Sequence, residues 1–383
     1  MKNFIPYGNH WIDQADIKAV NCVLKSEYLT QGPRVEEFEK ALCKYTKAKY
    51  CIVVSNGTAA LHLAVAALAI ERDSEGITSP NSFVASANCL AYNNLIPVFV
   101  DIDKDTYNIK PFEIEKSLTK KTKVIIPVHF AGQPCDMLAI NAIAKKNKLF
   151  VIEDAAHAIG SKYLDGSHVG NCKYSDMTIF SFHPVKTMTT GEGGAITTNN
   201  KVLYEKLKML RIHGITKDSK KLLQNPGMWY YEMQMLGFNY RMTDIQAALG
   251  LSQLKKLDKF IKRRREIVKK YNKAFRNINW IKIPYETEKV CSAFHLYVLQ
   301  IDFDKINKSR QTVMKELKNN NIGTQVHYIP IYKQPYYQNN YKHKKIFPNS
   351  EEYYKKTLSI PLYPKMHNNE INKVITCVKN IGI

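Results

Sequence analysis

The chain has 383 residues, 45% of them hydrophobic, which is enough to bury a sizeable core and to form a large and a small domain. No apolar run reaches the roughly 18 residues that a membrane span needs, and the start, MKNFIPYGNHW, lacks the apolar core of a signal peptide. The formal net charge of +22 would suit a nucleic-acid-binding protein, but the lysines are spread along helical faces and no nucleic-acid motif is present. We therefore expect a globular cytoplasmic protein with neither a nucleic-acid nor a membrane partner.

Two further features of the composition narrow the chemistry. The only compact basic run is KRRR at 262–265, which we interpret as a solvated helix face, although positive potential could also favour a small phosphorylated substrate. The eight cysteines are scattered without a CxxC pair. We interpret them as reduced structural residues that form neither a disulfide framework nor a metal site.

Strands alternate with helices along the first 200 residues. Short runs rich in β-branched and aromatic residues predict strands, and apolar periodicity between them predicts helices at 58–70 and 137–148. This alternation is typical of an α/β fold in which helices cover both faces of a mostly parallel sheet. The predicted strands are CIVV (51–54), PVFV (97–100), VIIPV (124–128), LFVIE (149–153) and TIFSF (178–182).

The pattern changes after residues 242–275, a long amphipathic stretch that predicts a helix. Residues 293–301 and 323–332 read as strands, with a helix predicted between them at 309–320. We expect a large domain over residues 1–254, including the N-terminal segment, and a smaller C-terminal α+β domain over residues 255–383.

Polar groups follow several of the predicted strands, where ligand sites form in open α/β sheets. Gly57 and Thr58 follow the first strand and begin a helix, so they could bind a phosphate or simply belong to an ordinary helix cap. Glu153 and Asp154 end a buried strand, where a carboxylate needs a cation or a donor, either from a ligand or from a structural salt bridge.

The segment SFHPVKTMTTGEGGA, at 181–195, places Ser181, His183 and Lys186 between a strand and a glycine-rich turn. A lysine in a loop is ordinarily only solvated. Here a phosphate cradle, a strand-end carboxylate and a lysine together match what pyridoxal phosphate requires. That cofactor needs an anchor for its phosphate, a partner for its pyridine nitrogen and an amine for a Schiff base.

Four motifs in a fixed order make the chain resemble the DegT-type sugar-nucleotide aminotransferases, which are fold-type I pyridoxal-phosphate enzymes. The resemblance extends from residue 5 to the C-terminal region and implies a seven-stranded, mostly parallel sheet in the large domain. Within the family, residues 79–92, 125–137 and 229–250 are most similar to members that serve pseudaminic acid biosynthesis. The four motifs are LTQGPRVEEFE (29–39), EDAAHAIG (153–160), SFHPVKTMTTGEGGA (181–195) and GFNYRMTDIQAALGLSQL (237–254).

The resemblance implies a role for each cofactor-binding residue. Lys186 is similar to the lysine that forms the Schiff base and moves protons, and Asp154 to the carboxylate that keeps the pyridine nitrogen protonated. His157 would reach the 3-oxygen of the ring, unless it is only a packed core histidine. Phe83 would stack on the ring, and the phosphate would be bound by Gly57, Thr58 and Ser181, joined by Asn239 of the partner subunit. Some close relatives carry alanine where this chain has Gly57, but glycine is common in the wider family.

The resemblance also implies a pocket for a nucleotide sugar. Arg241 would bind the diphosphate, because its planar guanidinium suits phosphate oxygens. His183 would either line the pocket or adjust the protonation of Lys186. The remaining residues expected around the sugar are Thr30, Gly32, His327 and Tyr328.

The resemblance thus implies a homodimeric aminotransferase with shared active sites. L-Glutamate would convert pyridoxal phosphate to pyridoxamine phosphate, which would aminate C4 of a UDP-linked 4-keto-6-deoxy-N-acetylhexosamine. Another UDP- or dTDP-linked 4-keto sugar is the alternative substrate. A pyridoxal-dependent sugar dehydratase is disfavoured because those relatives carry histidine in place of Lys186. A regulatory homologue without catalysis is disfavoured because Lys186, Asp154 and Ser181 are all retained.

Overall fold

A seven-stranded sheet forms the centre of the computed structural model, which describes residues 4–288, 290–341 and 346–382. The strand order is β1-β7-β6-β5-β4-β2-β3, and four of the six neighbouring pairs are parallel because only β7 runs against its neighbours. The expected α/β class and the seven-stranded, mostly parallel sheet are therefore confirmed. The strands are β1 (Tyr50–Val54), β2 (Glu75–Thr78), β3 (Ile96–Phe99), β4 (Thr122–Ile126), β5 (Phe150–Asp154), β6 (Met177–Ser181) and β7 (Gly194–Thr198).

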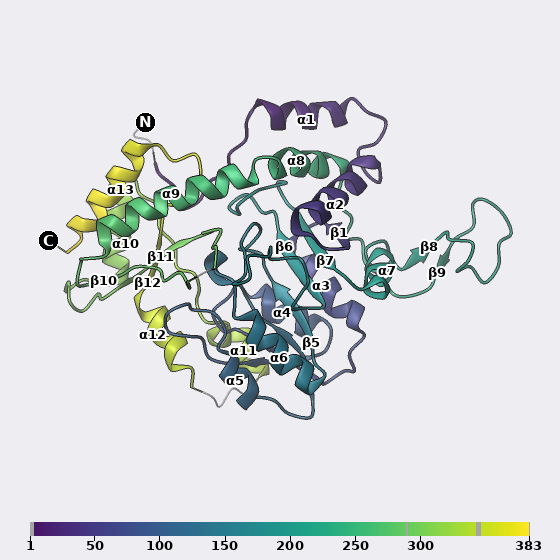
Figure 1. The fold of residues 1–383 in the computed structure, drawn as a ribbon, viewed down its shortest axis with the longest axis horizontal. Coiled ribbons are helices and arrows are strands. Elements are labelled where there is room, and N and C mark those ends of the chain that lie inside the picture. Colours follow the sequence, from purple (N-terminus) through teal and green to yellow (C-terminus); the bar gives the residue numbers. More distant parts are fainter. Residues whose placement is uncertain (1–3, 289, 342–345, 383) are drawn as a thin grey trace.

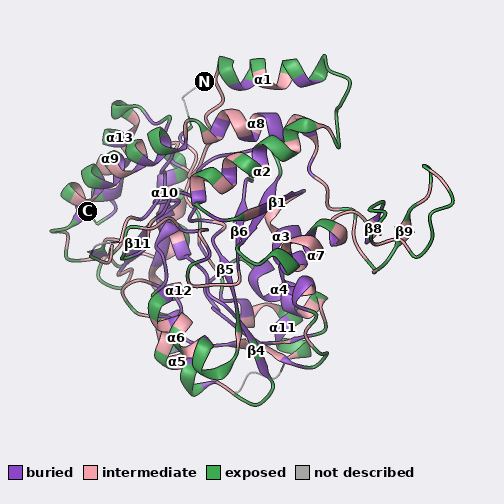
Figure 2. Cartoon of the chain, turned by 45° about the vertical axis from the view of Figure 1, so that its right-hand side comes forward, coloured by how far each residue is buried: buried purple, intermediate pink, exposed green. Residues whose placement is uncertain are grey.

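Helices cover both faces of this sheet, so most residues of its strands are buried (Figures 1 and 2). Along β1, Cys51 and Val53 belong to one apolar core, whereas Ile52 and Val54 belong to the other. This alternation follows from the period of two in a strand and explains the continuous apolar runs in the sequence. The first core is closed by α2 (Pro33–Thr46), α6 (Met137–Asn147) and α8 (Asp244–Leu254), and the second by α3 (Gly57–Leu68), α4 (Ala85–Tyr92) and α7 (Lys201–Leu210).

A smaller sheet and a third apolar core lie in the C-terminal part of the chain. The N-terminal segment joins this part, because the N–H of Ile5 donates to the carbonyl of Asn321 at 2.8 Å. The division at residues 254 and 255 stays a prediction. The elements here are β10 (Ile281–Lys282), β11 (Tyr297–Ile301), β12 (Thr357–Ile360), α9 (Leu257–Phe275), α10 (Arg310–Asn319), α12 (Pro348–Lys356) and α13 (Asn368–Asn380).

Three sequence-based expectations need correction. The stretch 242–275 forms two helices, α8 and α9, with a break at residues 255 and 256. Residues 323–332 do not form a strand: Gln325 makes an isolated bridge to Ser359, and Pro330 has no N–H to donate to a sheet. The run KRRR is not uniformly solvated, because Arg264 is fully buried and donates to the carbonyl of Leu362 at 2.8 Å.

A hairpin of β8 (Ile215–Thr216) and β9 (Glu232–Met233) projects away from the body of the molecule (Figure 1). Much of its surface is exposed (Figure 2). Within the described ranges, no helix is both long enough and apolar enough to cross a bilayer. The remaining helices are α1 (Gln14–Leu24), α5 (Pro111–Lys116), α11 (Pro335–Asn340) and the short 3₁₀ turns η1 (Phe130–Gly132) and η2 (Ile331–Lys333).

Candidate active site

The carboxyl ends of β1, β5 and β6 meet at one edge of the sheet. Many of the polar residues that the sequence predicts for the site lie at or just after these strand ends. β1 runs antiparallel to β7, which runs antiparallel to β6, so β1 and β6 point the same way as β5. The loop after β1 approaches the end of β6 so closely that a Cβ atom added to Gly57 would lie 2.8 Å from Cβ of Ser181. Glycine is therefore the residue that lets these two segments touch.

The N-terminus of α3 provides an anion site beside Ser181. The side chain of Asn56 caps the helix by accepting the N–H of Ala59 at 2.8 Å. The amides of Gly57 and Thr58 belong to the first turn, where a helix offers its own N–H groups no acceptor. The positive end of the helix dipole adds to their attraction for a phosphate. Gly57, Thr58 and Ser181 thus lie together, as the family resemblance implies, and their binding of a phosphate stays a prediction.

Asp154 ends β5 and is buried, with 4% of its surface exposed. One carboxylate oxygen accepts the hydroxyl of Ser86 at 2.6 Å, and the other accepts the N–H of Ala156 at 3.2 Å. These donors fix the orientation of the carboxylate without neutralising its charge. It therefore remains available to a cationic group, such as a protonated pyridine nitrogen. Sequence reasoning missed Ser86, although it lies within residues 79–92, one of the segments similar to the family.

Glu153 has a different role from its neighbour. It points to the other face of β5, is fully buried and accepts hydrogen bonds from His129, Tyr163 and Ser175. Burial raises its pKa, but these donors outweigh burial and lower the pKa overall. Glu153 is therefore a structural anchor that fixes the end of β5, which leaves Asp154 as the carboxylate of this pair that could meet a cofactor.

Lys186 lies in the loop between β6 and β7, and its backbone N–H donates to the carbonyl of His183 at 2.9 Å. Burial lowers the pKa of its amine to about 8, while the negative charge of Asp154 acts in the opposite direction. A lysine with this pKa is neutral often enough to act as a nucleophile and to exchange protons. His183 itself is exposed at the rim of the site.

Both ring nitrogens of His157 have a hydrogen-bond partner. Its Nδ1 accepts the N–H of Ala131 at 3.3 Å, so the ring proton resides on Nε2, which faces the hydroxyl of Tyr328 at 3.2 Å. Burial, followed by the charges of Lys186 and His327, keeps the pKa of His157 well below its ordinary value. His157 is therefore a neutral donor, as contact with an anionic ring oxygen requires.

His327 and Tyr7 close the site from the C-terminal part and the N-terminal segment. The Nδ1 of His327 lies 2.8 Å from the hydroxyl of Ser359 on β12, and its ring is 5.3 Å from the ring of Tyr7. Burial, with a contribution from Lys186, lowers the pKa of His327 to about 3. Tyr7 lies within the part of the chain that resembles the family but belongs to none of its four motifs, and sequence reasoning missed it.

An exposed aromatic residue overhangs the opening of the site. Phe83 is 57% exposed although it follows a buried strand, and its ring centroid lies 6.2 Å from that of Tyr328. The exposed ring leaves a face free for a flat group, which fits a stacking role toward the cofactor ring.

The segments around Arg241 and Gly32 form the outer edge of the site. The carbonyl of Tyr240 accepts the N–H of Ser55 at 2.9 Å, so residues 239–241 run beside the end of β1 of the same chain. Gly32 donates its N–H to Asp244 at 2.7 Å, and Thr30 pairs with Thr243. The structure thus gathers these sequence-predicted residues near the phosphate cradle, with the side chain of Asn239 exposed.

Together these groups fit pyridoxal phosphate. The cradle at Gly57 would hold its phosphate, Asp154 its pyridine nitrogen, His157 its ring oxygen and Lys186 its aldehyde carbon. The fold and the site therefore define a fold-type I pyridoxal-phosphate enzyme. The chain belongs to the DegT/DnrJ/EryC1/StrS aminotransferase family, whose model matches residues 10–379.

Known proteins support this class over the full length of the chain. The spore coat polysaccharide biosynthesis protein SpsC of Bacillus subtilis is 43% identical over 381 residues, covering 99% of this chain and 97% of SpsC. Helicobacter pylori PseC, an aminotransferase involved in the biosynthesis of pseudoaminic acid, matches with a TM-score of 0.92 and 32% identity over 99% of both chains. Spr1654 of Streptococcus pneumoniae, in its PLP form, matches with a TM-score of 0.91 and 30% identity over 99% of both chains. The protein is a pyridoxal-phosphate-dependent sugar aminotransferase, and pyridoxamine phosphate is the amine form of its cofactor.

Proposed function

We propose that this chain transfers the amino group of L-glutamate to C4 of UDP-2-acetamido-2,6-dideoxy-β-L-arabino-hex-4-ulose, giving UDP-4-amino-4,6-dideoxy-N-acetyl-β-L-altrosamine. The observation that carries the proposal is the likeness to Helicobacter pylori PseC over 99% of both chains. Three sequence segments, at 79–92, 125–137 and 229–250, favour the same pathway. Because its eight cysteines are free thiols, which suit a reducing compartment, we place the reaction in the cytoplasm.

The chemistry depends on groups that the chain places around the cofactor. The bound cofactor supplies an aldehyde that takes the amino group of glutamate and, as pyridoxamine phosphate, holds it until the sugar ketone arrives. Lys186 moves a proton to and from the carbon that carries the amino group. Its pKa of about 8 leaves about a tenth of the side chains neutral at pH 7. Asp154 keeps the pyridine nitrogen protonated, and His157 donates a hydrogen bond from Nε2 to the 3-oxygen of the ring.

The outer residues hold the nucleotide sugar in this proposal. Arg241 binds the diphosphate, while Thr30, Gly32, His183, His327 and Tyr328 surround the sugar. Asn239 reaches the cofactor phosphate of the partner subunit in a homodimer. Support for the dimer comes from the projecting hairpin, which exposes apolar side chains that a lone chain would leave in water. These are Leu223, Met228, Trp229, Tyr231, Met233 and Leu236.

A second candidate is amination of another UDP- or dTDP-linked 4-keto sugar. It is favoured by the identity to SpsC, which at 43% exceeds the 32% identity to PseC. The two candidates share every catalytic residue and differ only in the sugar and the nucleotide.

A panel of substrates tests the proposal. Purified protein is supplied with L-glutamate and with UDP- and dTDP-linked 4-keto-6-deoxy sugars, and products are identified by mass. We expect the highest kcat/KM with the UDP-linked L-arabino 4-ketosugar, with one 2-oxo acid formed for each amino sugar. Preference for another sugar would select the second candidate. Loss of a sugar oxygen without gain of nitrogen would indicate a dehydratase, and absence of any 2-oxo acid would indicate a non-catalytic homologue.

A further inference from the structure

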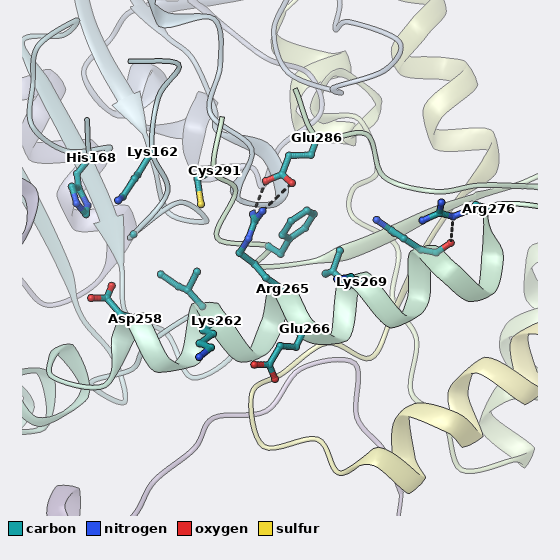
Figure 3. Close-up of a pocket in the computed structure, with 15 residues that line it drawn as sticks. Lys162, His168, Asp258, Lys262, Arg265, Glu266, Lys269, Arg276, Glu286 and Cys291 are labelled. Atoms are coloured by element: carbon teal, nitrogen blue, oxygen red, sulfur yellow. Dashed lines mark hydrogen bonds and ion pairs between the residues drawn. The ribbon is translucent and has the colours of Figure 1, made fainter. Parts of the chain in front are cut away.

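One pocket among the described residues does not lie at the candidate active site. It is a groove of about 740 Å³ along one side of α9, facing the segments around Lys162 and Cys291 (Figure 3). None of Lys186, Asp154 and His157 lines it. The groove, which we call the α9 groove, is therefore a separate feature of the molecule.

Positive side chains follow the groove along the helix. Lys262, Arg265, Lys269 and Arg276 all line it, at spacings of three, four and seven residues. These spacings place the four residues on one face of a helix, where 14 residues extend over about 21 Å. Lys162 faces them from the opposite wall. The arrangement is an elongated row of cations rather than a scatter of surface lysines.

The carboxylates of the groove are already engaged. Glu286 takes both terminal nitrogens of Arg265, at 2.6 and 3.2 Å, and so neutralises that side chain. Glu266 pairs with Arg263 at 3.1 Å, and Asp258 accepts the hydroxyl of Tyr45 at 2.6 Å. Glu266 and Glu286 are therefore paired with arginines, whereas Asp258 accepts only a neutral hydroxyl and has no cation paired with it among the described residues.

Four cations in the groove have no carboxylate partner within the described part of the chain: Lys162, Lys262, Lys269 and Arg276. Like charges held beside one hollow repel one another and raise the local positive potential. An anion bound between them removes this repulsion. The charge pattern thus selects for a ligand that carries several negative charges in a row.

The size and chemistry of the groove define this ligand further. Its volume lies within the roughly 300–1,000 Å³ typical of small-molecule sites. The lining also includes the apolar side chains Ile261, Val268 and Phe294, each of which is itself largely buried. We propose that the α9 groove binds a diphosphate group, either free or esterified in a nucleotide. Lysine ammonium groups and the planar guanidinium of Arg276 are the donors that phosphate oxygens prefer.

The groove and the candidate active site share a wall. Phe294 lines the groove, and the ring of its neighbour His295 lies 4.4 Å from the ring of His157. Because the candidate active site is also expected to bind phosphates, a binding measurement must report which site is filled. The amines of Lys262 and Lys269 provide such a report, since both are exposed and lie in the groove alone.

The test uses the holoenzyme with inorganic pyrophosphate and UDP as separate probes. Acetylation of each lysine by an amine-reactive reagent is followed by mass spectrometry as the probe is titrated. We expect either probe or both to protect Lys262 and Lys269 at least fivefold, with no change at Lys145 and Lys201. Protection by both probes identifies a free diphosphate as sufficient, and protection by UDP alone identifies the esterified form.

Matched variants complete the test. K262Q/K269Q/R276Q removes three positive charges from the groove, whereas K145Q/K201Q/K255Q removes three charges from exposed positions elsewhere. Calorimetry of the groove variant should lose, or weaken at least tenfold, the binding event that protects Lys262 and Lys269 in the parent, while binding at the candidate active site persists and the control is unchanged. Circular dichroism confirms that both variants are folded. The proposal is overturned if neither probe protects the two lysines, or if both variants lose binding equally, because that result would reflect net charge alone.

Discussion

Burial of a single amine governs the chemistry that Lys186 can perform. A solvated lysine is almost wholly protonated at neutral pH, whereas the low-dielectric loop between β6 and β7 lowers the pKa of this amine to about 8. The nearby charge of Asp154 limits that shift, so the lysine stays within reach of both protonation states. A group that must give and take a proton in one catalytic cycle needs this intermediate position.

Replacing Lys186 with alanine should lower turnover by about 10²- to 10⁴-fold or more, because no other amine replaces its proton transfer. Cofactor should still bind, since the phosphate cradle and Asp154 remain. Turnover and cofactor retained after gel filtration measure the two effects, with Lys201→Ala as the control for loss of a lysine. The assignment fails if borohydride reduction of the parent enzyme attaches the cofactor to a different lysine.

The lowered pKa of Lys186 also predicts how stability varies with pH. Between the folded value of about 8 and the unfolded value of about 10.4, the unfolded chain binds more protons. The free energy of unfolding should therefore rise with pH in this window, relative to a Lys186→Met variant that lacks the group. Urea unfolding of both apoproteins from pH 7 to 10 measures the difference. A difference that stays constant across the window would mean that the amine keeps its ordinary pKa.

The sequence predicts those residues of the site that have distinctive chemistry. Among them is Asp154, the charged group that acts on the amine of Lys186. Asp154, Lys186 and the cradle at Gly57 could be found because each follows a strand and carries an unusual group for its position. Ser86 and Tyr7 could not, since a serine in a helix and a tyrosine near the N-terminus are ordinary. Only the folded chain shows that Ser86 donates to Asp154 and that Tyr7 packs on His327.

At the scale of elements, β4, β5 and β6 were predictable because burial on both faces makes them continuous apolar runs, whereas β2, with the sequence EGIT, has no such run and was not predicted. The region 323–332 has a similar composition, but a strand also needs a neighbouring strand to pair with. Within this region only Gln325 forms a β-bridge, to Ser359 of β12. The break between α8 and α9 has no strong local signal. There Lys256 leaves the helical stretch to pair with Asp16 of α1 at 2.5 Å, a contact that depends on residues 240 positions away.

The projecting hairpin of β8 and β9 carries a prediction of its own. Met228 and Trp229 are exposed at its far end, where an isolated chain gains nothing from them. Replacing both with serine should shift the protein from dimer to monomer, because the interface would lose apolar area. Light scattering after gel filtration measures the mass, and Leu138→Ser, at another exposed apolar position on α6, is the control. An unchanged dimer would place the interface elsewhere.

At the scale of the whole molecule, the exposed hairpin and the exposed Asn239 raise the same question, which is whether a second copy of the chain covers them in a dimer. Residues 239–241 flank β1 of their own chain through backbone bonds, yet the side chain of Asn239 faces outward. A two-fold dimer that covers the hairpin would use the same patch on both chains. Each proposed active site would then combine Lys186 of one chain with Asn239 and Arg241 of the other.

Mixed dimers test this arrangement directly. A Lys186→Ala protein and an Asn239→Ala/Arg241→Ala protein, each nearly inactive, are unfolded and reassembled together. Random pairing makes half of the dimers mixed, and each mixed dimer then has one intact site and one doubly damaged site. Activity should recover to about one quarter of the parent value. If mass analysis shows mixed dimers but activity stays at the level of the components, Asn239 and Arg241 serve the site of their own chain. The backbone contacts beside β1, rather than the outward side chain, would then describe their role.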